Sequence, residues 1–514
     1  MRKLCRFIFS RYALSAVSIL VSLILLCVLL FYASSYSVYI FITMVVLDVI
    51  VILSIINRDA NPEYKLPWVV ISLIIPFFGA ALYLVFYSRK LGRKDASFLV
   101  RIHDEANLAK QNAALLGLSE EADAIDDPAV RGKATALLGD DPAADIYRAT
   151  STYYPLGELM LDAMLADLSA AEEYIFLEYF IVDEGVMWDR IYAVLREKAS
   201  HGVDVRLLYD DIGSMNTIPA SFPSRLRDDG IKCNRFAKVT PRVSAIHNNR
   251  DHRKICVIDG TVAYTGGVNI ADEYINAIDR FGHWKDGGIR IEGSAALGFT
   301  KQFLIMWDFT TGTVSNYSTY FSASRTSSEH DGGIYIPFGS GPAPVYPRPT
   351  GKNVFLNLIN QAERYVYITT PYLIIDYALT EALKCAAHRG VEVIIVTPSR
   401  ADKKTVKVMT KSSYPSLIAA GVKIYEYLPG FIHEKLMAVD DKYAVVGTIN
   451  LDYRSLVHHF EDGVWMYATP TVLRIRDSFR DTVSVSRKIE EEDAKLSFFE
   501  WIVRNLVRLF APLL

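Results

Sequence analysis

The chain has 514 residues, which is too long for one ordinary domain and suggests two to four. Its formal net charge is −3, so no strongly basic surface favours nucleic acid as a partner. The five cysteines are odd in number and lack metal-ligand spacing, which fits a reducing compartment better than a disulfide-bonded secreted fold.

Three apolar runs open the chain, over residues 12–33, 38–56 and 66–87. Each is close to the roughly 20 residues that a helix needs to cross a bilayer, so we expect a membrane-anchoring region over residues 1–95. A cleaved signal peptide is an alternative for the first run. The second run follows after a few residues, however, and favours a permanent anchor.

The orientation of this region follows from two basic clusters that flank it. They are Arg2, Lys3, Arg6 and Arg11 before the first run, and Arg89, Lys90, Arg93 and Lys94 after the third. The positive-inside rule places both clusters in the cytoplasm, which requires an even number of crossings. Pro67, Pro76 and Gly79 indicate that the third run is broken, re-entrant or shallow. We expect a multi-pass protein of the plasma membrane with the rest of the chain on the cytoplasmic side.

The remainder of the chain divides by composition. Residues 96–145 are polar and rich in Ala, Asp and Glu, which predicts a linker with some helix. Residues 146–310 and 350–490 each contain an apolar strand, a helical pattern, a glycine and a second apolar strand, which is typical of an α/β domain. Residues 311–349 are rich in Ser, Thr, Gly and Pro and are expected to link the two. Residues 491–514 predict a C-terminal amphipathic helix.

The two α/β domains are copies of each other. "YIFLEY" (174–179) matches "YVYITTPY" (365–372), and "DDGIKCNRF" (228–236) matches "AAGVKIYEY" (419–427). Self-similarity at so long a period indicates a duplicated domain and not a solenoid of short repeats.

The duplication includes a motif of three polar residues in an apolar setting. His252, Lys254 and Asp259 recur 181 residues later as His433, Lys435 and Asp440. A single copy would be weak support for catalysis, since a lone buried histidine is usually a satisfied core group. Two copies in register make catalysis the favoured interpretation.

The spacing of the motif predicts a phosphodiester site. Residues two apart in a strand share a face, so each histidine lies beside its lysine, and packing about a pseudo-twofold axis would bring both pairs to one cleft. The lysines suit the non-bridging oxygens of the phosphate. One histidine can attack phosphorus to form a phospho-histidine while the other protonates the leaving alkoxide.

Further polar residues accompany the motif. Asn269 and Asn450 end the equivalent segments "TGGVN" and "VGTIN", and their amides can donate to a phosphate. Asp259 and Asp440 belong to the candidate catalytic set, although we expect them to fix the local turn and the lysine. No metal is expected, because a lysine on the same face as each histidine would repel a divalent cation.

The doubled HxKxxxxD motif resembles that of the phospholipase D superfamily, and other segments resemble its bacterial cardiolipin synthase family. These segments span residues 61–90, 202–214, 252–274, 425–441, 447–455 and 511–514. The resemblance implies a duplicated phospholipase D-type α/β domain with two mixed β-sheets, flanking helices and pseudo-twofold symmetry, preceded by transmembrane helices. It also implies that two phosphatidylglycerol molecules in an anionic membrane yield cardiolipin and glycerol, with no cofactor.

The same resemblance implies an acidic residue after each motif that orients a histidine, and Asp286 and Glu461 fit this role. We expect His252 to be the nucleophile and His433 the general acid, and the pseudosymmetry leaves the reverse assignment open.

Two residues depart from the family pattern. Asp251 stands where asparagine is usual before the first motif, and His459, next to His458, stands where asparagine commonly precedes the second acidic residue. If the missing amide binds a phosphate oxygen, donor preference or efficiency would differ, unless His459 donates in its place.

Other hypotheses remain open. The chain could be a phospholipase D-type hydrolase or another phosphatidyltransferase, such as a serine-dependent synthase. A nuclease and a non-catalytic scaffold are less favoured, because of the membrane region and the complete motifs. A cationic stripe of Lys403 or Lys404, Lys407 and Lys411 could meet anionic headgroups, and a solvated helix face explains it at least as well.

Overall fold

The computed structural model describes residues 37–59, 61–86, 93–115, 117–238, 249–321, 329–343 and 346–493, with isolated positions at 24, 502, 504, 505 and 508–510. The chain divides into two compact units, one made mainly of residues 1–88 and the other of most of the remaining chain. Apart from those isolated positions, the first apolar run (12–33) and residues 494–514 of the predicted C-terminal helix lie outside the described residues.

The first unit contains helix α3 (Ser37–Ile56), which corresponds to the second apolar run. Within the described residues, α3 is the helix that is long and apolar enough to cross a membrane, over Val38–Ile56. Most of its side chains face outward from the unit, as expected for a helix whose surroundings are lipid.

The third apolar run is broken, as the prolines and Gly79 predict. It forms two helices, α4 (Pro62–Ile74) and α5 (Phe78–Phe86), separated by a turn in which Phe77 has a φ of 67°. Gly79 lies so close to Ser72 that a Cβ would meet its Cα at 2.4 Å. Neither helix alone is long enough to span a bilayer, so this run does not form a third continuous crossing.

The second unit is built on two mixed sheets. In spatial order, the first contains β1 (Ala149–Tyr154), β8 (Gly288–Gly293), β6 (Val262–Gly266), β5 (Lys254–Ile258), β2 (Tyr174–Tyr179), β3 (Asp204–Asp210) and β4 (Lys232–Phe236). The second contains β19 (Ser486–Ile489), β13 (Lys423–Tyr427), β12 (Glu392–Pro398), β10 (Tyr365–Thr369), β15 (Leu436–Val439), β16 (Tyr443–Gly447), β18 (Glu461–Tyr467) and β9 (Ile334–Ser340).

The two sheets confirm the predicted duplication. In each, three parallel strands are followed by an antiparallel strand that carries the motif: β4, β3, β2 and β5 in the first sheet, and β13, β12, β10 and β15 in the second. The region predicted as an interdomain linker (311–349) departs from expectation, because β9 lies within it and pairs along its whole length with β18. Its polar composition concealed a fully buried seven-residue strand.

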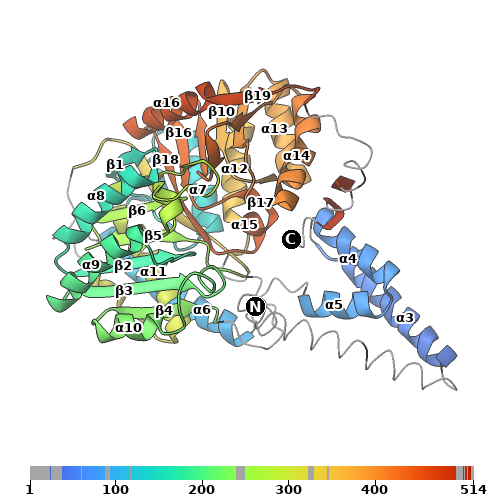
Figure 1. Cartoon of the computed structure of the whole chain (residues 1–514), viewed down its shortest axis with the longest axis horizontal. Helices are drawn as coiled ribbons and strands as arrows, with labels where there is room; N and C mark the ends of the chain where they lie inside the picture. The colour runs from blue at the N-terminus through green and yellow to red at the C-terminus, as the bar shows by residue number, and fades with distance from the viewer. Residues whose placement is uncertain are drawn as a thin grey trace. The chain divides into compact units, whose positions relative to one another are not determined.

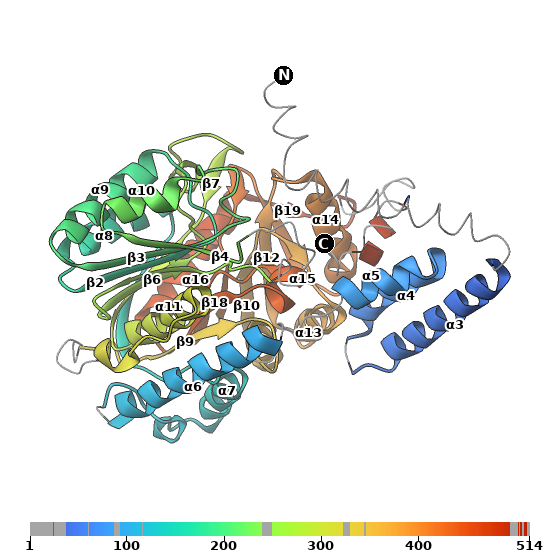
Figure 2. The same ribbon diagram turned by 90° about the horizontal axis from the view of Figure 1, so that it is seen from below.

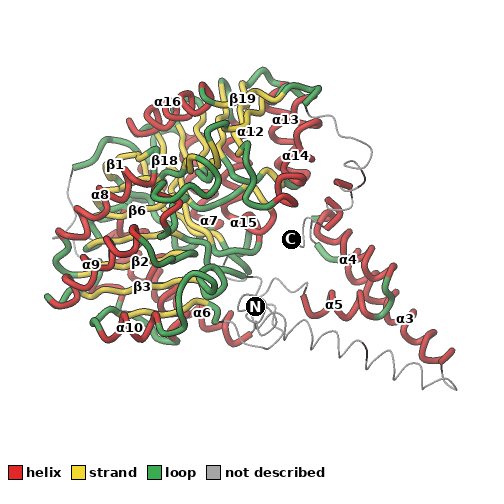
Figure 3. Tube along the Cα trace, in the orientation of Figure 1, coloured by secondary structure: helices red, strands yellow, loops and turns green. Residues whose placement is uncertain are grey.

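Helices cover the outer faces of both sheets and separate them at the centre (Figures 1 and 3). They are α8 (Gly157–Ala170), α9 (Val186–Ser200), α10 (Phe222–Asp228), α11 (Ala296–Thr311), α12 (Thr350–Gln361), α13 (Tyr377–His388), α14 (Lys404–Ile418), α15 (Tyr453–Val457) and α16 (Pro470–Ser484). One apolar core joins the inner faces of the sheets through α11 and α16, and each outer face has a core of its own. The shared core holds the two copies in a fixed mutual position.

The predicted linker at 96–145 is also part of this packing. Most of it forms α6 (Arg93–Leu115) and α7 (Pro128–Asp140), and α6 runs beside α11 (Figure 2). Leu99, Ile102 and Ala106 of α6 are fully buried in the shared core. The segment therefore has the expected helix but is not a free tether.

Short backbone bridges connect the two copies next to the motifs. Strand β7 (His283–Lys285) of the first copy pairs in parallel with β14 (Gly430–Ile432) of the second, and Asp251 forms the equivalent bridge with Phe460. The motif histidines follow directly: the His433 N–H donates to Lys285 O at 2.8 Å, and the His252 N–H donates to Phe460 O at 2.9 Å. The chain just before each histidine is thus fixed to the other copy. Within the second copy, a two-stranded pair joins β11 (Leu373–Ile374) to β17 (Leu451–Asp452).

We expect Gly430→Ala to weaken the bridge between β7 and β14. A Cβ at this position would lie 2.3 Å from His283 O and 2.5 Å from His283 N, so the two strands must separate. Thermal unfolding followed by circular dichroism should show a lower Tm, corresponding to about 1–3 kcal/mol. Gly132→Ala is the matched control, since an added methyl in α7 meets nothing within 4 Å and should be neutral or stabilising. Equal Tm values for the two variants would contradict the prediction.

Candidate active site

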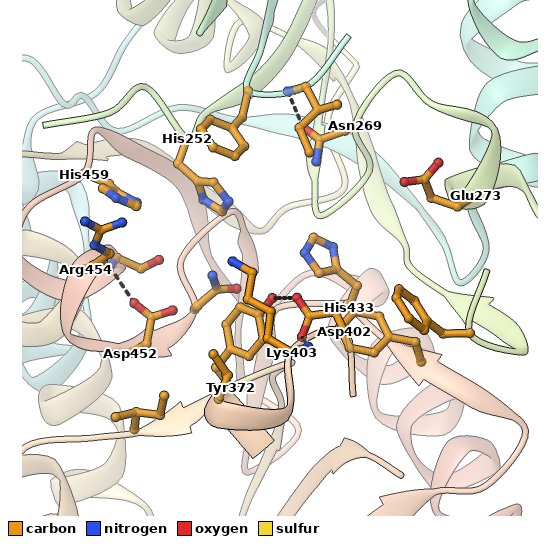
Figure 4. Close-up of a pocket in the computed structure, with 18 of the residues that line it drawn as sticks. His252, Asn269, Glu273, Tyr372, Asp402, Lys403, His433, Asp452, Arg454 and His459 are labelled. Atoms are coloured by element: carbon orange, nitrogen blue, oxygen red, sulfur yellow. Dashed lines mark hydrogen bonds between the residues drawn. The ribbon is translucent and has the colours of Figure 1, made fainter. Parts of the chain in front are cut away.

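A cavity of about 550 Å³ lies between the two copies and receives both motif histidines (Figure 4). Aromatic and apolar side chains form much of its wall: Phe180, Ile181, Tyr274, Phe281, Trp284, Tyr372, Ile374, Val406, Met409, Phe431 and Tyr453. The polar lining consists of His252, Asn269, Glu273, Arg280, Asp402, Lys403, Thr405, His433, Asn450, Asp452, Arg454, Ser455 and His459. A concave site that combines an aromatic and apolar wall with convergent polar groups is typical of a small-molecule or lipid-headgroup pocket.

His252 is held by a carboxylate of the second copy. Its Nδ1 lies 2.9 Å from Glu461 Oε2, and the Thr448 hydroxyl donates to the same oxygen at 2.5 Å. Glu461 is fully buried. Because the carboxylate accepts the proton on Nδ1, the Nε2 lone pair is left free for chemistry.

His433 is held in the mirror arrangement by a carboxylate of the first copy. Its Nδ1 lies 2.6 Å from Asp286 Oδ2. Gly267 packs against Asp286 at the position equivalent to Thr448, and a Cβ there would lie 2.0 Å from Oδ1. The two predicted orienting acids therefore lie beside the histidines, and each one serves the histidine of the opposite copy.

Burial sets the protonation of these groups. It lowers the pKa of the His252 imidazole to about 3, against the raising effect of Glu461, and it lowers the pKa of His433 well below its usual value. Burial also raises the pKa of Asp286 to about 6. Glu461 differs: burial acts upward, but the charge and hydrogen bond of His252 hold its pKa below the usual range. At neutral pH both rings are neutral and can act as nucleophile or base.

The two motif lysines lie against their own histidines. Lys254 Nζ donates to His252 O at 2.6 Å, and Lys435 Nζ donates to His433 O and lies 2.7 Å from His433 Nδ1. Burial lowers the pKa of Lys254 to about 8 and that of Lys435 to about 7, while nearby carboxylates oppose the shift. A cation held this close to a neutral imidazole is poised to meet an anion that binds beside the ring.

The two motif aspartates lie away from the cavity. Asp259, with a φ of 51°, accepts the backbone N–H groups of Glu172, Glu173 and Tyr174 at 2.8 Å. Asp440, with a φ of 58°, accepts three N–H groups in the same way, from Glu363, Arg364 and Tyr365. Both carboxylates fix the strand that carries the motif, which is the expected turn role. Neither aspartate lines the cavity, so this geometry does not support a direct contact of either carboxylate with the substrate.

The two candidate asparagines line the cavity but are not equivalent. Asn269 Oδ1 accepts the Ile181 N–H at 3.0 Å, and its Nδ2 donates to the Tyr274 hydroxyl at 2.7 Å. Asn450 Oδ1 is buried without a hydrogen-bond partner among the described residues. Asn450 is therefore the asparagine with more unused hydrogen-bonding capacity toward a ligand.

The surroundings of the two histidines differ in ways that the sequence did not reveal. The His433 ring is surrounded by the aromatic rings of Tyr274, Trp284 and Phe431, with centroids 5.5–5.9 Å away. The His252 ring faces Phe180 at 5.0 Å and His459 at 5.7 Å. Arg454 and Lys403 also line the cavity. One indication in the sequence that Arg454 is functional is its position in segment 447–455, which resembles the cardiolipin synthase family.

The two departures from the family pattern have different positions. His459 lines the cavity, as its suggested donor role requires. Asp251 is fully buried outside the cavity lining, where Arg253 lies 3.5 Å from it and ion-pairs with Glu178 at 2.9 Å. The structure therefore does not support a role for Asp251 in phosphate binding, because its carboxylate lies in a buried cluster with Arg253 and Glu178.

The lysine stripe predicted on α14 is interrupted. Lys407 turns inward, donating to Glu426 at 2.7 Å. Lys403 lines the cavity, whereas Lys404 does not and is exposed to solvent. Facing different directions, these side chains do not form one cationic surface.

One set of side chains could in principle chelate a metal within the described part of the chain. Candidate ligand atoms of His252, His459 and Glu461 all lie within 4.8 Å of one another. Glu461 Oε2 already accepts two hydrogen bonds, from His252 and Thr448, and the Lys254 ammonium adjoins His252. The donor set therefore suits the orientation of a histidine better than the coordination of a divalent cation.

Comparisons with known proteins agree with this geometry. A family model described as "Cardiolipin synthase, PLD-like domain" matches residues 164–279 and 355–483, and one described as "Phospholipase_D-nuclease N-terminal" matches residues 46–86. An uncharacterised protein of Streptococcus mutans is 38% identical over 90% of this chain and 99% of its own. A cardiolipin synthase of Alkalihalophilus pseudofirmus is 32% identical over 89% of this chain and 90% of its own. The crystal structure of phosphatidylserine synthase from Haemophilus influenzae has the same fold, with a TM-score of 0.56 at 14% identity over 74% of this chain and 98% of that one.

Two copies of one fold, meeting at paired histidines, define a phosphatidyltransferase of the phospholipase D superfamily. Within that superfamily, the similarity to a cardiolipin synthase extends over about nine-tenths of the sequence. The chain belongs to the bacterial cardiolipin synthase family. Its apolar helix α3 is consistent with a membrane protein that acts on phospholipid.

We expect Asp286 to set an acid limb in the pH profile of phosphatidyl transfer. Its pKa is about 6, and only the ionised carboxylate accepts the His433 Nδ1 proton, so kcat/KM should fall as the pH drops through about 6. Glu461 stays ionised over this range, because its pKa lies below the usual value. In Asp286→Asn the limb should disappear, with a rate roughly 10²- to 10⁴-fold lower. A limb near pH 6 that persists in Asp286→Asn would assign it to another group.

Proposed function

We propose that this protein joins two phosphatidylglycerol molecules to form cardiolipin and release glycerol. The observation that carries the proposal is the crossed pairing of His252 with Glu461 and of His433 with Asp286 on one cavity. This geometry supplies two neutral imidazoles, each oriented through its Nδ1, and both line one cavity. The relatives named cardiolipin synthase support the substrate assignment.

In the first step, Nε2 of one histidine attacks the phosphorus of phosphatidylglycerol. The bond from phosphorus to the glycerol oxygen breaks, and the other histidine gives its proton to that oxygen. A general acid must be protonated, and the negative phosphate favours the protonated ring despite its burial. The products are free glycerol and a phosphatidyl-histidine. Lys254 and Lys435 turn from the histidine carbonyls to the non-bridging oxygens, and Asn450 adds a hydrogen bond.

In the second step, a primary hydroxyl of another phosphatidylglycerol attacks the phosphatidyl-histidine. The histidine that gave up its proton takes the hydroxyl proton, and the bond from phosphorus to nitrogen breaks. Cardiolipin leaves, the nucleophilic ring is again neutral, and the other ring is again protonated, as at the start of the cycle. We favour His252 as the nucleophile, and the pseudosymmetric geometry allows His433 to take that role. No metal takes part in either step.

We further propose that the enzyme is a multi-pass protein of the plasma membrane with its catalytic unit in the cytoplasm. The basic clusters that flank residues 12–87 support this orientation through the positive-inside rule. A cytoplasmic catalytic unit would meet phosphatidylglycerol in the leaflet where the headgroups face it.

The purified protein in phosphatidylglycerol vesicles, with a chelator present, should form cardiolipin and release equimolar glycerol. Lipid mass spectrometry and an enzymatic glycerol assay measure the two products. Phosphatidic acid as the main product would indicate a hydrolase, since water would then be the acceptor. Loss of activity on chelation would refute the metal-free mechanism.

His252→Ala and His433→Ala should each lower cardiolipin formation by at least about 10³-fold, because both displacements need both rings. The double variant should be no worse than the poorer single variant, since the two histidines act as a unit. His388→Ala, at an exposed position in α13, is the control that should keep full activity. Quenching of the parent enzyme during turnover with detergent at mildly alkaline pH, followed by peptide mapping without an acid step, would identify the nucleophile, because the bond from phosphorus to nitrogen is acid-labile. Near-normal turnover in either single variant would refute the shared site.

A further inference from the structure

The cavity breaks the symmetry of the duplication at two pairs of equivalent positions. Arg454 lies 181 residues after Glu273, the same offset that relates the motifs, and both side chains line the cavity. His459 and Trp284 also correspond, since each stands two residues before an orienting acid. One copy thus supplies an arginine and a histidine where the other supplies a glutamate and a tryptophan.

The two sides of the cavity therefore differ in charge. Glu273 forms an ion pair with Arg280, so its charge is compensated. Trp284 packs beside His433 among other aromatic rings. Figure 4 shows Glu273 on one side of the two histidines and Arg454 with His459 on the other. An aromatic side and a side that carries Arg454, His459 and the Asp452 carboxylate suit chemically different parts of the substrates.

Arg454 and His459 are held together by the backbone. The Arg454 carbonyl accepts the N–H groups of both His458 and His459, at 2.8 and 2.9 Å. Asp452, in the same turn, accepts the Ser455 N–H at 2.9 Å and so fixes the start of α15. The two side chains therefore enter the cavity from one rigid turn, which favours them as a preorganised pair.

The polar groups of this pair are unused. His459 is 9% exposed, and both ring nitrogens lack a hydrogen-bond partner among the described residues. The nearest carboxylate oxygen, Glu461 Oε1, is 3.7 Å from its Nδ1, which is beyond hydrogen-bond distance. The Arg454 residue is exposed, and the charge of the Asp452 carboxylate acts on its guanidinium without forming an ion pair within 4 Å in the described part of the chain. Buried polar nitrogens that lack partners point to a ligand.

The proposed reaction requires an anion site beyond the motifs. The phosphate that reacts is bound by Lys254, Lys435 and the two motif histidines, and the released glycerol carries no charge. The acceptor phosphatidylglycerol has a phosphodiester of its own, and in cardiolipin the two phosphates are separated by the three carbons of one glycerol. Water as an acceptor would need no such site, so a second anion site would favour synthesis over hydrolysis.

We propose that Arg454 and His459 bind the phosphodiester of the acceptor phosphatidylglycerol and so select this lipid over water and neutral alcohols. The inference rests on the proposed function and deepens it. The guanidinium donates to the non-bridging oxygens of the acceptor phosphate, and a ring N–H of His459 adds a second donor. His459, 5.7 Å from the His252 ring, sets this phosphate close to the reacting one.

The test compares two acceptors on one phosphatidyl-enzyme. The full-length protein is placed in vesicles with an increasing fraction of phosphatidylglycerol in phosphatidylcholine, with labelled glycerol in the water. Cardiolipin formation reports the anionic acceptor, and exchange of labelled glycerol into phosphatidylglycerol reports the neutral one. The variants are Arg454→Gln, His459→Phe and Arg454→Lys, with Lys404→Gln as the matched control that removes an exposed positive charge outside the cavity lining.

Arg454→Gln and His459→Phe should lower cardiolipin formation by about tenfold or more at low phosphatidylglycerol, as expected for a lost hydrogen bond to a charged group. Glycerol exchange should stay within about twofold of the parent, and phosphatidic acid should rise relative to cardiolipin. Arg454→Lys should recover part of the loss, and Lys404→Gln should keep the parent's product ratio.

Parallel loss of both reactions in Arg454→Gln and His459→Phe would place these residues at the donor phosphate or in the fold, and would overturn the inference. An unchanged product ratio would overturn it as well. A parent enzyme that makes phosphatidic acid and no cardiolipin would instead refute the proposed function. The two failures are therefore distinguishable.

Discussion

The site depends on one constraint, the crossed hydrogen bonds between the two copies of the fold. Each motif histidine is oriented by a carboxylate of the other copy, and the backbone just before each histidine is bridged to that copy as well. Neither copy alone contains an oriented imidazole. The shared core around α11 and α16 thus has a chemical role as well as a stabilising one, since it holds each carboxylate within hydrogen-bond distance of its histidine.

Burial then determines how the crossed pairs behave. It removes the charge from both rings and brings the pKa values of Lys254 and Lys435 down to about 8 and 7. In this state the lysines donate to the backbone carbonyl oxygens of the motif histidines, and the Nε2 atoms of the histidines are free to attack. A phosphodiester that enters the cavity brings a negative charge next to the two lysines, so the bound substrate stabilises their charged form.

Duplication gives two equivalent halves, but a transfer between two lipids needs unequal ones. The differences at Glu273 and Arg454, and at Trp284 and His459, supply that inequality without disturbing the motifs. The histidine, lysine and aspartate of the motif must occupy the same positions relative to the phosphate and the strand in both copies, and they are the same residues in both. The cavity wall is free of those demands and differs between the copies.

The sequence by itself determined the duplication, the paired motifs and the break in the third apolar run, because each leaves a local or periodic pattern, and the family resemblance pointed to the two orienting acids. It assigned β9 to a linker and predicted helix but no packing for α6, because the burial of both elements comes from partners distant in the chain: β18 for β9, and α11 for α6. It left open whether Asp251 bears on phosphate binding and whether the α14 lysines form a common stripe, because a side chain's direction depends on its packing. Only the tertiary structure decided which acid serves which histidine, and only it brought Arg454 and His459 to one side of the cavity. Those relations join residues across separate copies and loops, and such contacts are fixed by packing in three dimensions.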